Sequence, residues 1–405
     1  MIKAPEAPRV NIELLSSIVQ ADPFPIYRKM RDEFPICRIE PDGAYYAISR
    51  DADVRTALKS PNLFSSRAAR HVYETEHLSA EARRDYSVFS QDPPEHTKNR
   101  QLINKAFVRR VIDELHDYMT ESAEKMVSSI EPGKPFDFLT SAGEYAASIL
   151  TRVTGTSDVQ TYAELKHWLS LSEVLKLDRP PREHMEKLEH AQIQQRKQFY
   201  NVVNSRRSKP QSDLVSELLG AKVDGEGLSD KQIVSLLELL LAAGFDTISY
   251  SLCHAIMFFT KRPDILAQLR ADPESIPNFI EELLRYDPPT HQLLRKTTEE
   301  VELSGCVIPS GSFVLLMIGS ANRDERRYEN PDEFVLSRFG AKEHLAFGIG
   351  AHVCVGSALA RAEIKIALTK ILERYSNISC AKDTELDWLS SLNVRATTAL
   401  PAIFS

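Results

Sequence analysis

The sequence predicts a mainly α-helical protein with small antiparallel β-sheets, the α+β class. A capping pattern at Ser229 and Gln232 opens a long apolar run that ends near Lys261. Between residues 111 and 207 the apolar spacing of several amphipathic helices recurs between Pro and Gly breaks. Short runs of alternating apolar residues, such as residues 44–48, are typical of strands. We therefore expect helices to form most of the fold, with small sheets beside them.

The composition is that of an ordinary globular protein. No Gly/Ser-rich spacer, repeat or low-complexity tract divides the 405 residues, so we expect residues 1–405 to form one domain. The net charge of -7 disfavours a nucleic-acid-binding protein, because such proteins usually carry a basic excess. The sequence shows no signal-peptide core and no run of 18 apolar residues, which predicts a cytoplasmic protein without a membrane anchor.

The five cysteines are scattered along the chain and form no CxxC pair. This spacing disfavours a zinc ribbon or a disulfide framework and fits a reducing compartment. Four of the five stand in ordinary contexts: Cys37, Cys253, Cys306 and Cys380. The fifth, Cys354, stands in a glycine-rich loop and is considered below.

The N-terminal region predicts two helices, a strand and a long loop. A helical run follows Asp22-Pro23 and ends at Glu33, and a second helix is expected over residues 51–59, after the strand at residues 44–48. Residues 65–91 are polar and show no clear period. A loop of this length inside a compact domain is often functional or mobile.

A further helix is expected after Asp92-Pro93-Pro94. Its His96 and Arg100 are four residues apart and share one face, which suits an anion, although a solvated pair is the commoner reason for such spacing. The same region is basic on an acidic protein, through Lys98, Lys105, Arg109 and Arg110. This basic patch is either a solvated charged face or a docking surface for an acidic partner protein.

The long helix expected from Ser229 carries an unusual polar group in its middle. Residues 239–245 are almost entirely apolar and are followed by Asp246 and Thr247. A carboxylate in such a setting is costly unless it is paired or functional. We expect Gly244 and Thr247 to loosen the local helix ladder.

Two later segments complete the predicted elements. Glu282 and Arg285 are three residues apart on an expected helix, a spacing that by itself says little. Residues 301–316 predict hairpin strands around Gly305 and Gly311, and residues 392–403 predict strands and a turn.

The most distinctive stretch is Phe347-Gly348-Ile349-Gly350-Ala351-His352-Val353-Cys354-Val355-Gly356. It precedes a periodic run, residues 357–375, which predicts a helix. A thiolate is favoured over a thiol when the sulfur lies at a helix N-terminus, which would make Cys354 a metal ligand or a nucleophile with His352 as its base. The alternative is a buried small hydrophobe, which is what most free cysteines are.

The pattern Phe-Gly-x-Gly-x-His-x-Cys-x-Gly resembles the haem-thiolate loop of the cytochrome P-450 family. Further motifs of that family occur in the expected order: Asp-Pro-Pro-Glu-His-Thr from Asp92, Ala-Gly-Phe-Asp-Thr from Ala243, Glu-x-x-Arg from Glu282, and a later loop that carries Arg338. The resemblance covers essentially the whole chain and is to the soluble bacterial members. It implies a single domain of the cytochrome P-450 type.

The resemblance implies that the chain binds haem b (iron protoporphyrin IX), with Cys354 as the axial ligand of the iron. It assigns His96, Arg100, Arg295 and His352 to the propionates. It places Ala243, Gly244, Phe347, Gly348, Gly350 and Gly356 against the haem or its sulfur ligand. The small Ala243 and Gly244 would leave room for dioxygen over the iron. Asp246 would relay protons and Thr247 would hydrogen-bond the oxygen being activated, while Glu282, Arg285 and Arg338 would form a structural ion-pair network.

The implied reaction is monooxygenation, in which one atom of O2 enters a hydrophobic small molecule by hydroxylation or epoxidation. Electrons would come from a separate ferredoxin or flavodoxin with its reductase, docking near the basic patch. Residues Tyr162 to Arg207 would form a lid over the substrate, with a hinge at residues 177–181. The implied substrate contacts are Ala68, Val72, Phe89, Leu239, Ala243, His291, Leu293, Leu294, Asn393 and Val394, and His291 either orients a polar substrate or points into solvent.

Two alternatives use the same haem. One is a peroxide-driven or oxidative-coupling enzyme, and the other is a haem-binding protein that catalyses no reaction. Enzymes of the first kind often lack the acid–alcohol pair that Asp246 and Thr247 supply here, so the pair favours a monooxygenase.

Overall fold

The computed structural model describes residues 4–40, 45–68, 87–106, 109–172, 182–381 and 385–405. Val72 and the expected hinge at residues 177–181 lie outside the described residues. The chain divides into two compact units. Unit 1 comprises residues 1–65, 123–142 and 247–405, and unit 2 comprises residues 66–122 and 143–246.

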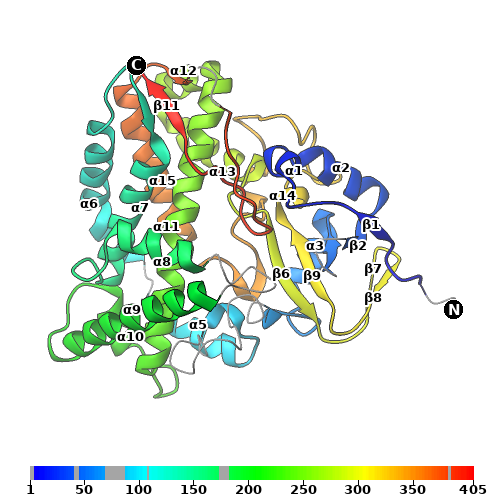
Figure 1. Cartoon of the computed structure of the whole chain (residues 1–405), viewed down its shortest axis with the longest axis horizontal. Coiled ribbons are helices and arrows are strands. Elements are labelled where there is room, and N and C mark those ends of the chain that lie inside the picture. The colour runs from blue at the N-terminus through cyan, green and yellow to red at the C-terminus, as the bar shows by residue number, and fades with distance from the viewer. Residues whose placement is uncertain (1–3, 41–44, 69–86, 107–108, 173–181, 382–384) are drawn as a thin grey trace. The chain divides into compact units, whose positions relative to one another are not determined.

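Unit 1 contains the largest sheet, which has six strands in the order β1-β2-β3-β9-β6-β4 (Figure 1). Its strands are β1 (Arg9–Asn11), β2 (Ile36–Glu40), β3 (Tyr45–Ile48), β9 (Phe313–Met317), β6 (Gln292–Thr297) and β4 (Phe64–Ser65). The pairs β1–β2 and β3–β9 are parallel and the other neighbours are antiparallel. The sheet is therefore mixed, where the sequence predicted antiparallel pairing.

Both faces of this sheet are buried. Ile48 and Leu316 lie in a cluster with Val54 and Leu58 of α3 (Asp51–Lys59). The preceding residues of the same strands face the opposite way and join a second cluster with Tyr27 and Met30 of α2 (Phe24–Glu33). This alternation follows from the period of two along a strand. One helix consequently covers each face of β3 and β9.

Two smaller sheets complete the strands described for unit 1. One has the order β10-β11-β5, formed by β10 (Ile378–Cys380), β11 (Pro401–Phe404) and β5 (Pro135–Asp137). The other is the hairpin of β7 (Val301–Leu303) and β8 (Cys306–Ile308), which confirms the hairpin predicted there. The remaining helices are α1 (Ser17–Ala21), α12 (Pro263–Ala271), η3 (Pro273–Ser275), α13 (Ile276–Tyr286), α14 (Ile318–Ala321), η4 (Ala341–Glu343), η5 (Gly350–His352) and α15 (Ser357–Arg374).

The described part of unit 2 is helical. It holds η1 (Val88–Ser90), α5 (Glu95–Ala106), α8 (Tyr162–Ser172), α9 (Arg182–Ser208) and α10 (Leu214–Gly220). Three further helices contribute residues to both units: α6 (Arg109–Ser128), α7 (Phe138–Thr154) and α11 (Asp230–Lys261).

The start of α11 confirms the predicted capping box. The backbone N–H of Gln232 donates to Ser229 Oγ at 3.3 Å, and the N–H of Ser229 donates back to Gln232 Oε1 at 2.9 Å. Of the helices described, α11 alone is long and apolar enough to cross a membrane. However, 61% of its most apolar stretch is buried inside the protein, a property it shares with the core helices of soluble proteins.

Candidate functional site

The glycine-rich loop before α15 presents the sulfur of Cys354 at an exposed position. The Cys354 N–H donates to the Phe347 carbonyl at 2.8 Å, and the Gly348 N–H donates to the Leu345 carbonyl at 2.8 Å. These two bonds close a compact loop that ends three residues before the first residue of α15. The loop therefore holds the sulfur close to the N-terminus of a helix, where a thiolate is favoured.

Gly350 cannot be replaced without moving the backbone around it. Its φ is +75°, and a Cβ there would lie 2.8 Å from the carbonyl oxygen of Leu58, at the end of α3. At Gly356, by contrast, a Cβ would make only an ordinary contact with the Cys354 sulfur, at 4.0 Å. The glycine at position 350 thus lets the loop pack against α3, and the glycine at 356 is not required for space.

The candidate propionate residues fall in both units. In unit 1, Arg295 lies on β6, is 6% exposed and donates to the Leu294 carbonyl at 2.8 Å, while His352 ends η5. In unit 2, His96 and Arg100 lie about one turn apart on α5. The Arg100 Nε donates to Asn104 Oδ1 at 3.0 Å.

His96 differs from Arg100 in charge. Burial, and then the nearby Arg100 guanidinium, lower the pKa of His96 from its ordinary value. The imidazole is therefore mainly neutral at pH 7. In that form it can donate one hydrogen bond to a carboxylate, and the positive charge on this face comes from Arg100.

The two small residues of the α11 motif occupy different surroundings. Gly244 packs so closely on α7 that a Cβ would lie 2.7 Å from a methyl group of Leu150. Ala243 is exposed, whereas Phe245 is buried against the ring of Tyr162, with their centroids 6.0 Å apart. A side chain at position 244 would therefore meet Leu150, whereas Ala243 is the exposed residue of the two.

The helix ladder of α11 is continuous through this motif. The sequence predicted that Gly244 and Thr247 would loosen it, but α11 runs as one helix from Asp230 to Lys261. The hydroxyl of Ser251 donates to the carbonyl of Thr247 at 2.8 Å, one turn further along. Side-chain bonds of this kind bend helices slightly without ending them.

The Glu-x-x-Arg pair lies at the centre of a fully buried network. Arg285 Nε and the Glu282 carboxylate are 2.7 Å apart, and both side chains are 0% exposed. Arg338 Nε donates to the other oxygen of Glu282 at 2.9 Å. Arg285 also donates to the carbonyls of Asn322 and Pro331, at 3.0 and 2.9 Å. The pair thereby joins α13 to the loop that precedes the cysteine.

Two candidate substrate segments, about 100 residues apart in sequence, lie side by side in unit 1. Thr290 and Val394 form an antiparallel bridge, and the His291 N–H donates to the Asn393 carbonyl at 2.9 Å. Leu293 and Leu294 follow on β6 and are half-buried. The C-terminal turn at Asn393 and Val394 therefore pairs with the backbone just before β6.

The side chain of His291 is buried, so it does not point into solvent. Its Nδ1 lies 3.1 Å from the Tyr27 hydroxyl and its Nε2 lies 3.4 Å from Asp287 Oδ1. Its neighbour Gly319 has no room for a Cβ, which would come within 2.9 Å of the ring. Burial lowers the pKa of His291 to about 4, although Asp287 acts in the opposite direction.

Asp287 connects His291 to the C-terminal turn. Its carboxylate accepts a hydrogen bond from Arg395 at 2.6 Å, and its backbone carbonyl lies 2.9 Å from Nδ1 of the buried His254. Burial alone would raise the pKa of Asp287, but Arg395 and the two histidines outweigh burial and hold that pKa well below its ordinary value. Asp287 is therefore a charged carboxylate that ties the two segments together.

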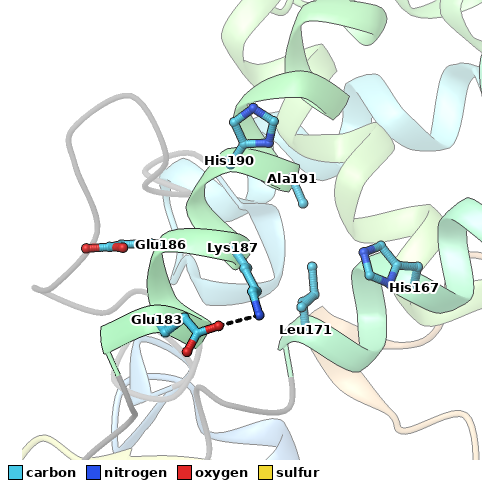
Figure 2. A pocket seen from close by; sticks show the side chains of 7 residues that line it. All are labelled: His167, Leu171, Glu183, Glu186, Lys187, His190 and Ala191. Carbon is cyan, nitrogen blue, oxygen red and sulfur yellow. Dashed lines mark hydrogen bonds and ion pairs between the residues drawn. The ribbon is translucent and has the colours of Figure 1, made fainter.

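The other candidate substrate residues differ in exposure. Ala68 is 1% exposed, whereas Phe89 and Leu239 are half-buried. A pocket of about 440 Å³ lies between α8 and α9, inside the segment expected to form the lid, and none of the candidate substrate contacts lines it (Figure 2). It is lined by His167, Leu171, Glu183, Glu186, Lys187, His190 and Ala191.

Two lysines of the basic patch have partners on the segment between α10 and α11. Lys98 forms an ion pair with Glu226. The Lys105 ammonium donates to the backbone carbonyl of Lys222 at 2.9 Å. Since Glu226 compensates Lys98, the patch is less basic than its sequence suggests.

Several side chains at the site were not identified from the sequence. Asp287 and Arg395 are separated by more than 100 residues, so no local pattern joins them. Glu281, His344 and Arg361 meet beside Phe347. The available signal was weak: each stands close to a motif residue but outside the motif.

The residues of unit 1 fit a thiolate-bound iron porphyrin. Among the described residues no group of three or more His, Cys, Asp or Glu side chains could hold a metal ion. Thiolate is a known axial ligand of haem iron, and Arg295 and His352 supply groups that suit carboxylates.

Comparisons with known proteins extend over nearly the whole chain. A family model described as Cytochrome P450 matches residues 5–399. A protein of Mycobacterium tuberculosis described as putative cytochrome P450 123 is 33% identical over 383 residues, which are 94% of this chain and 93% of that protein.

Two solved structures share the fold. CYP109Q5 from Chondromyces apiculatus has a TM-score of 0.88 and 29% identity, with 98% of each chain covered. CYP109E1 from Bacillus megaterium in complex with testosterone has a TM-score of 0.82 and 27% identity, covering 94% of this chain and 99% of that chain.

Proposed function

The chain belongs to the cytochrome P450 family, and from that premise we propose a haem-thiolate monooxygenase that inserts one atom of O2 into a mostly hydrophobic small molecule. The observation that carries the proposal is the exposed Cys354, whose backbone N–H donates to the Phe347 carbonyl in the loop just before α15. The adjacent Asp246 and Thr247 on α11 support oxygen activation with proton delivery.

The proposed cofactor is haem b, with Cys354 as its thiolate ligand. When bound, the haem supplies the redox chemistry of dioxygen, and the thiolate favours O–O cleavage. Arg100, Arg295 and His352 would neutralise or hydrogen-bond its carboxylates, with neutral His96 as a further donor. Phe347, Gly348, Gly350 and Gly356 would shape the sulfur side, and exposed Ala243 would face the oxygen side with Gly244.

The proposed proton path uses Asp246 and Thr247. A carboxyl group can pick up a proton and release it to a hydroxyl within hydrogen-bond reach. Thr247 would then donate that proton where charge develops on oxygen. Glu282, Arg285 and Arg338 are proposed as structural residues, because all three side chains are nearly or fully buried and bonded to one another.

The proposed substrate is an apolar molecule of about steroid size. Support comes from the apolar or small character of most candidate contacts (Ala68, Val72, Phe89, Leu239, Leu293, Leu294, Val394) and from the similarity to CYP109E1, which was solved with testosterone. Asn393 is a further candidate contact and has a polar side chain. The side chain of His291 lies against Tyr27 and Asp287. His291 would therefore affect the substrate contacts only through its backbone N–H, which donates to the Asn393 carbonyl.

We further propose that the protein is cytoplasmic, forms a single domain and receives electrons from a ferredoxin or flavodoxin with its reductase. The single domain is supported by the three helices that each contribute residues to both units. Docking would use the basic patch of Lys98, Lys105, Arg109 and Arg110.

The first test replaces the sulfur ligand. Cys354→Ala should abolish the thiolate-type absorbance band of the reduced carbon monoxide complex, because no other group at that position can supply a thiolate. Cys380→Ala is the matched control, since Cys380 is also exposed and lies far away in sequence on β10. A Cys354→Ala protein that kept the band would refute the proposal.

A second measurement separates the monooxygenase from its alternatives. Purified protein is supplied with O2, a ferredoxin, its reductase and a panel of apolar ligands that includes testosterone. Product formed with this electron supply supports the monooxygenase. Product formed only with added peroxide supports a peroxide-driven enzyme, and haem binding without product from any ligand supports a non-catalytic protein.

A further inference from the structure

The ring of Phe347 lies against the ion pair of Arg361 and Glu281, to which the proposed haem site gives no role. The Arg361 guanidinium carbon is 4.4 Å from the centroid of that ring, and the ring of His344 is 5.7 Å from it. Arg361 donates to both oxygens of Glu281, at 2.5 and 2.9 Å. His344 Nε2 lies 3.3 Å from the same carboxylate. A guanidinium, an imidazole and a carboxylate therefore meet beside the Phe347 ring.

The orientation of His344 is set by its second nitrogen. Nδ1 accepts a hydrogen bond from the Ala346 N–H at 3.1 Å, so a neutral ring carries its proton on Nε2, which faces Glu281. Burial alone would raise the pKa of Glu281, but the bonds from Arg361 and His344 outweigh burial and lower that pKa to about 2. Glu281 is thus a buried carboxylate that stays charged near neutral pH.

This cluster is connected directly to the cysteine loop. The Phe347 carbonyl accepts the Cys354 N–H, so the residue whose ring touches Arg361 also holds the backbone of the ligand. Arg361 donates in addition to the Ser357 carbonyl at 3.3 Å, in the first turn of α15. Glu281 itself is fixed on α13, next to the buried Glu282.

We propose that Glu281 and Arg361 are positioning residues that set the electrostatic potential at the Cys354 sulfur in opposite directions, with His344 orienting the carboxylate. The proposal rests on the role of Cys354 as haem ligand. A nearby cation stabilises added negative charge and an anion opposes it, and both effects are stronger at partly buried sites than in water. The two charges compensate each other in the intact pair.

The proposal predicts shifts of opposite sign. Arg361→Gln leaves the Glu281 carboxylate uncompensated and should move the reduction potential of the haem to a more negative value. Glu281→Gln leaves the Arg361 cation and should move it to a more positive value. The double variant should return close to the wild type. Damage to the loop would instead shift both single variants in the same direction.

The experiment is a spectroelectrochemical titration of the haem-loaded full chain and these three variants, at low and at high salt. Arg361→Lys is the charge-conserving control and should stay near the wild-type potential. Since Arg361 is 36% exposed, the Arg361→Gln shift should diminish at high salt. Each variant is first checked for the thiolate band of its carbon monoxide complex.

The outcomes are distinguishable from those of the proposed function. A wild-type protein without the thiolate band would refute the assignment of Cys354 itself. With the band intact, equal-sign shifts, or an unchanged potential in both single variants, would overturn the role of the pair. If Glu281→Gln fails to bind haem, the reduction potentials of Arg361→Gln and Arg361→Lys are compared instead. Equal potentials in these two variants would overturn the proposal. A shift to a more negative potential in Arg361→Gln alone would support it.

Discussion

Thr247 is the residue whose chemistry the sequence singles out most sharply after the cysteine. It follows Asp246 on α11, and its carbonyl accepts a hydrogen bond from Ser251. This hydrogen bond involves only the backbone carbonyl of Thr247. The role of the Thr247 hydroxyl can therefore be tested separately by removing it. In the proposed mechanism, proton delivery depends on this one hydroxyl group of Thr247.

Thr247→Ala should retain the haem and the thiolate band but lose product yield per electron by roughly tenfold or more, with hydrogen peroxide formed instead. The measurement compares product, peroxide and reduced cofactor consumed in one assay. Ser251→Ala removes a hydroxyl one turn away and should leave that ratio unchanged. An unaltered ratio in Thr247→Ala would remove Thr247 from the proton path.

His96 shows how surroundings change the meaning of a residue type. The sequence predicts an imidazole and a guanidinium that both suit an anion. Burial and Arg100 lower the pKa of His96, so the pair offers one charge and one neutral donor. The residue types were predictable, but their charge depended on burial, which the spacing of two residues cannot reveal.

At the scale of elements, the contact between α7 and α11 depends on a missing side chain. Leu150 occupies the space beside Gly244, at a distance that no Cβ could tolerate without movement. The predicted role of Gly244, space for a small molecule, is therefore accompanied by a packing role that the structure alone reveals. Helix packing of this closeness needs a residue without a side chain.

Gly244→Ala should lower the free energy of unfolding by about 1–2 kcal/mol, because the clash with Leu150 exceeds the gain in helix propensity. In a Leu150→Ala background the same substitution should become stabilising by about 0.5–1 kcal/mol, since the clash is gone and the propensity gain remains. Denaturant unfolding of the four haem-loaded proteins gives both values. The same sign in both backgrounds would contradict the packing argument.

At the scale of the whole molecule, residues from both ends of the chain meet in one buried network. Tyr27 of α2, His254 of α11, Asp287 after α13 and Arg395 near the C-terminus all face His291 or its partner carboxylate. The two segments that carry candidate substrate contacts are joined through it. This network therefore couples the stability of unit 1 to the position of those segments.

The network predicts a specific response to acid. The pKa of His291 is about 4 in the folded chain and about 6.5 in the unfolded chain, so between these values the unfolded chain binds the extra proton. Its contribution to stability is complete above pH 6.5 and is lost as the pH falls toward 4, with a limiting slope of roughly 1.4 kcal/mol per pH unit. Asp287, whose pKa is also depressed, loses its contribution at still lower pH.

His291→Gln should be less stable than the wild type at pH 7 but should lose less stability between pH 6.5 and 4.5. Thermal unfolding of both proteins across this range measures the difference. Tyr27, His254, Asp287 and Arg395 are retained in the variant, so the difference between the two curves reports the loss of His291 together with its effect on the pKa of Asp287. Parallel curves for the two proteins would show that His291 takes up no extra proton on unfolding.

The sequence alone determined the elements with strong local signals. The helices at residues 24–33 and 51–59, the capped start of α11 and the helix after Cys354 are confirmed, because periodicity, capping residues and proline act over a few neighbouring positions. The family was also identifiable, since the cysteine loop fixes several residues within ten positions. The candidate site residues carried over from that resemblance remain predictions that the experiments above test.

Only the tertiary structure decided what these residues contact. Leu150 beside Gly244, Glu281 and Arg361 beside Phe347, and Asp287 between His291 and Arg395 are pairs from distant parts of the chain. The parallel pairing of β3 with β9 in the large sheet has the same origin, because Tyr45 and its partner Phe313 are 268 positions apart in the sequence and no local pattern joins them. Burial and long-range packing set these contacts and the pKa values that follow from them, and neither is written in the spacing of neighbouring residues.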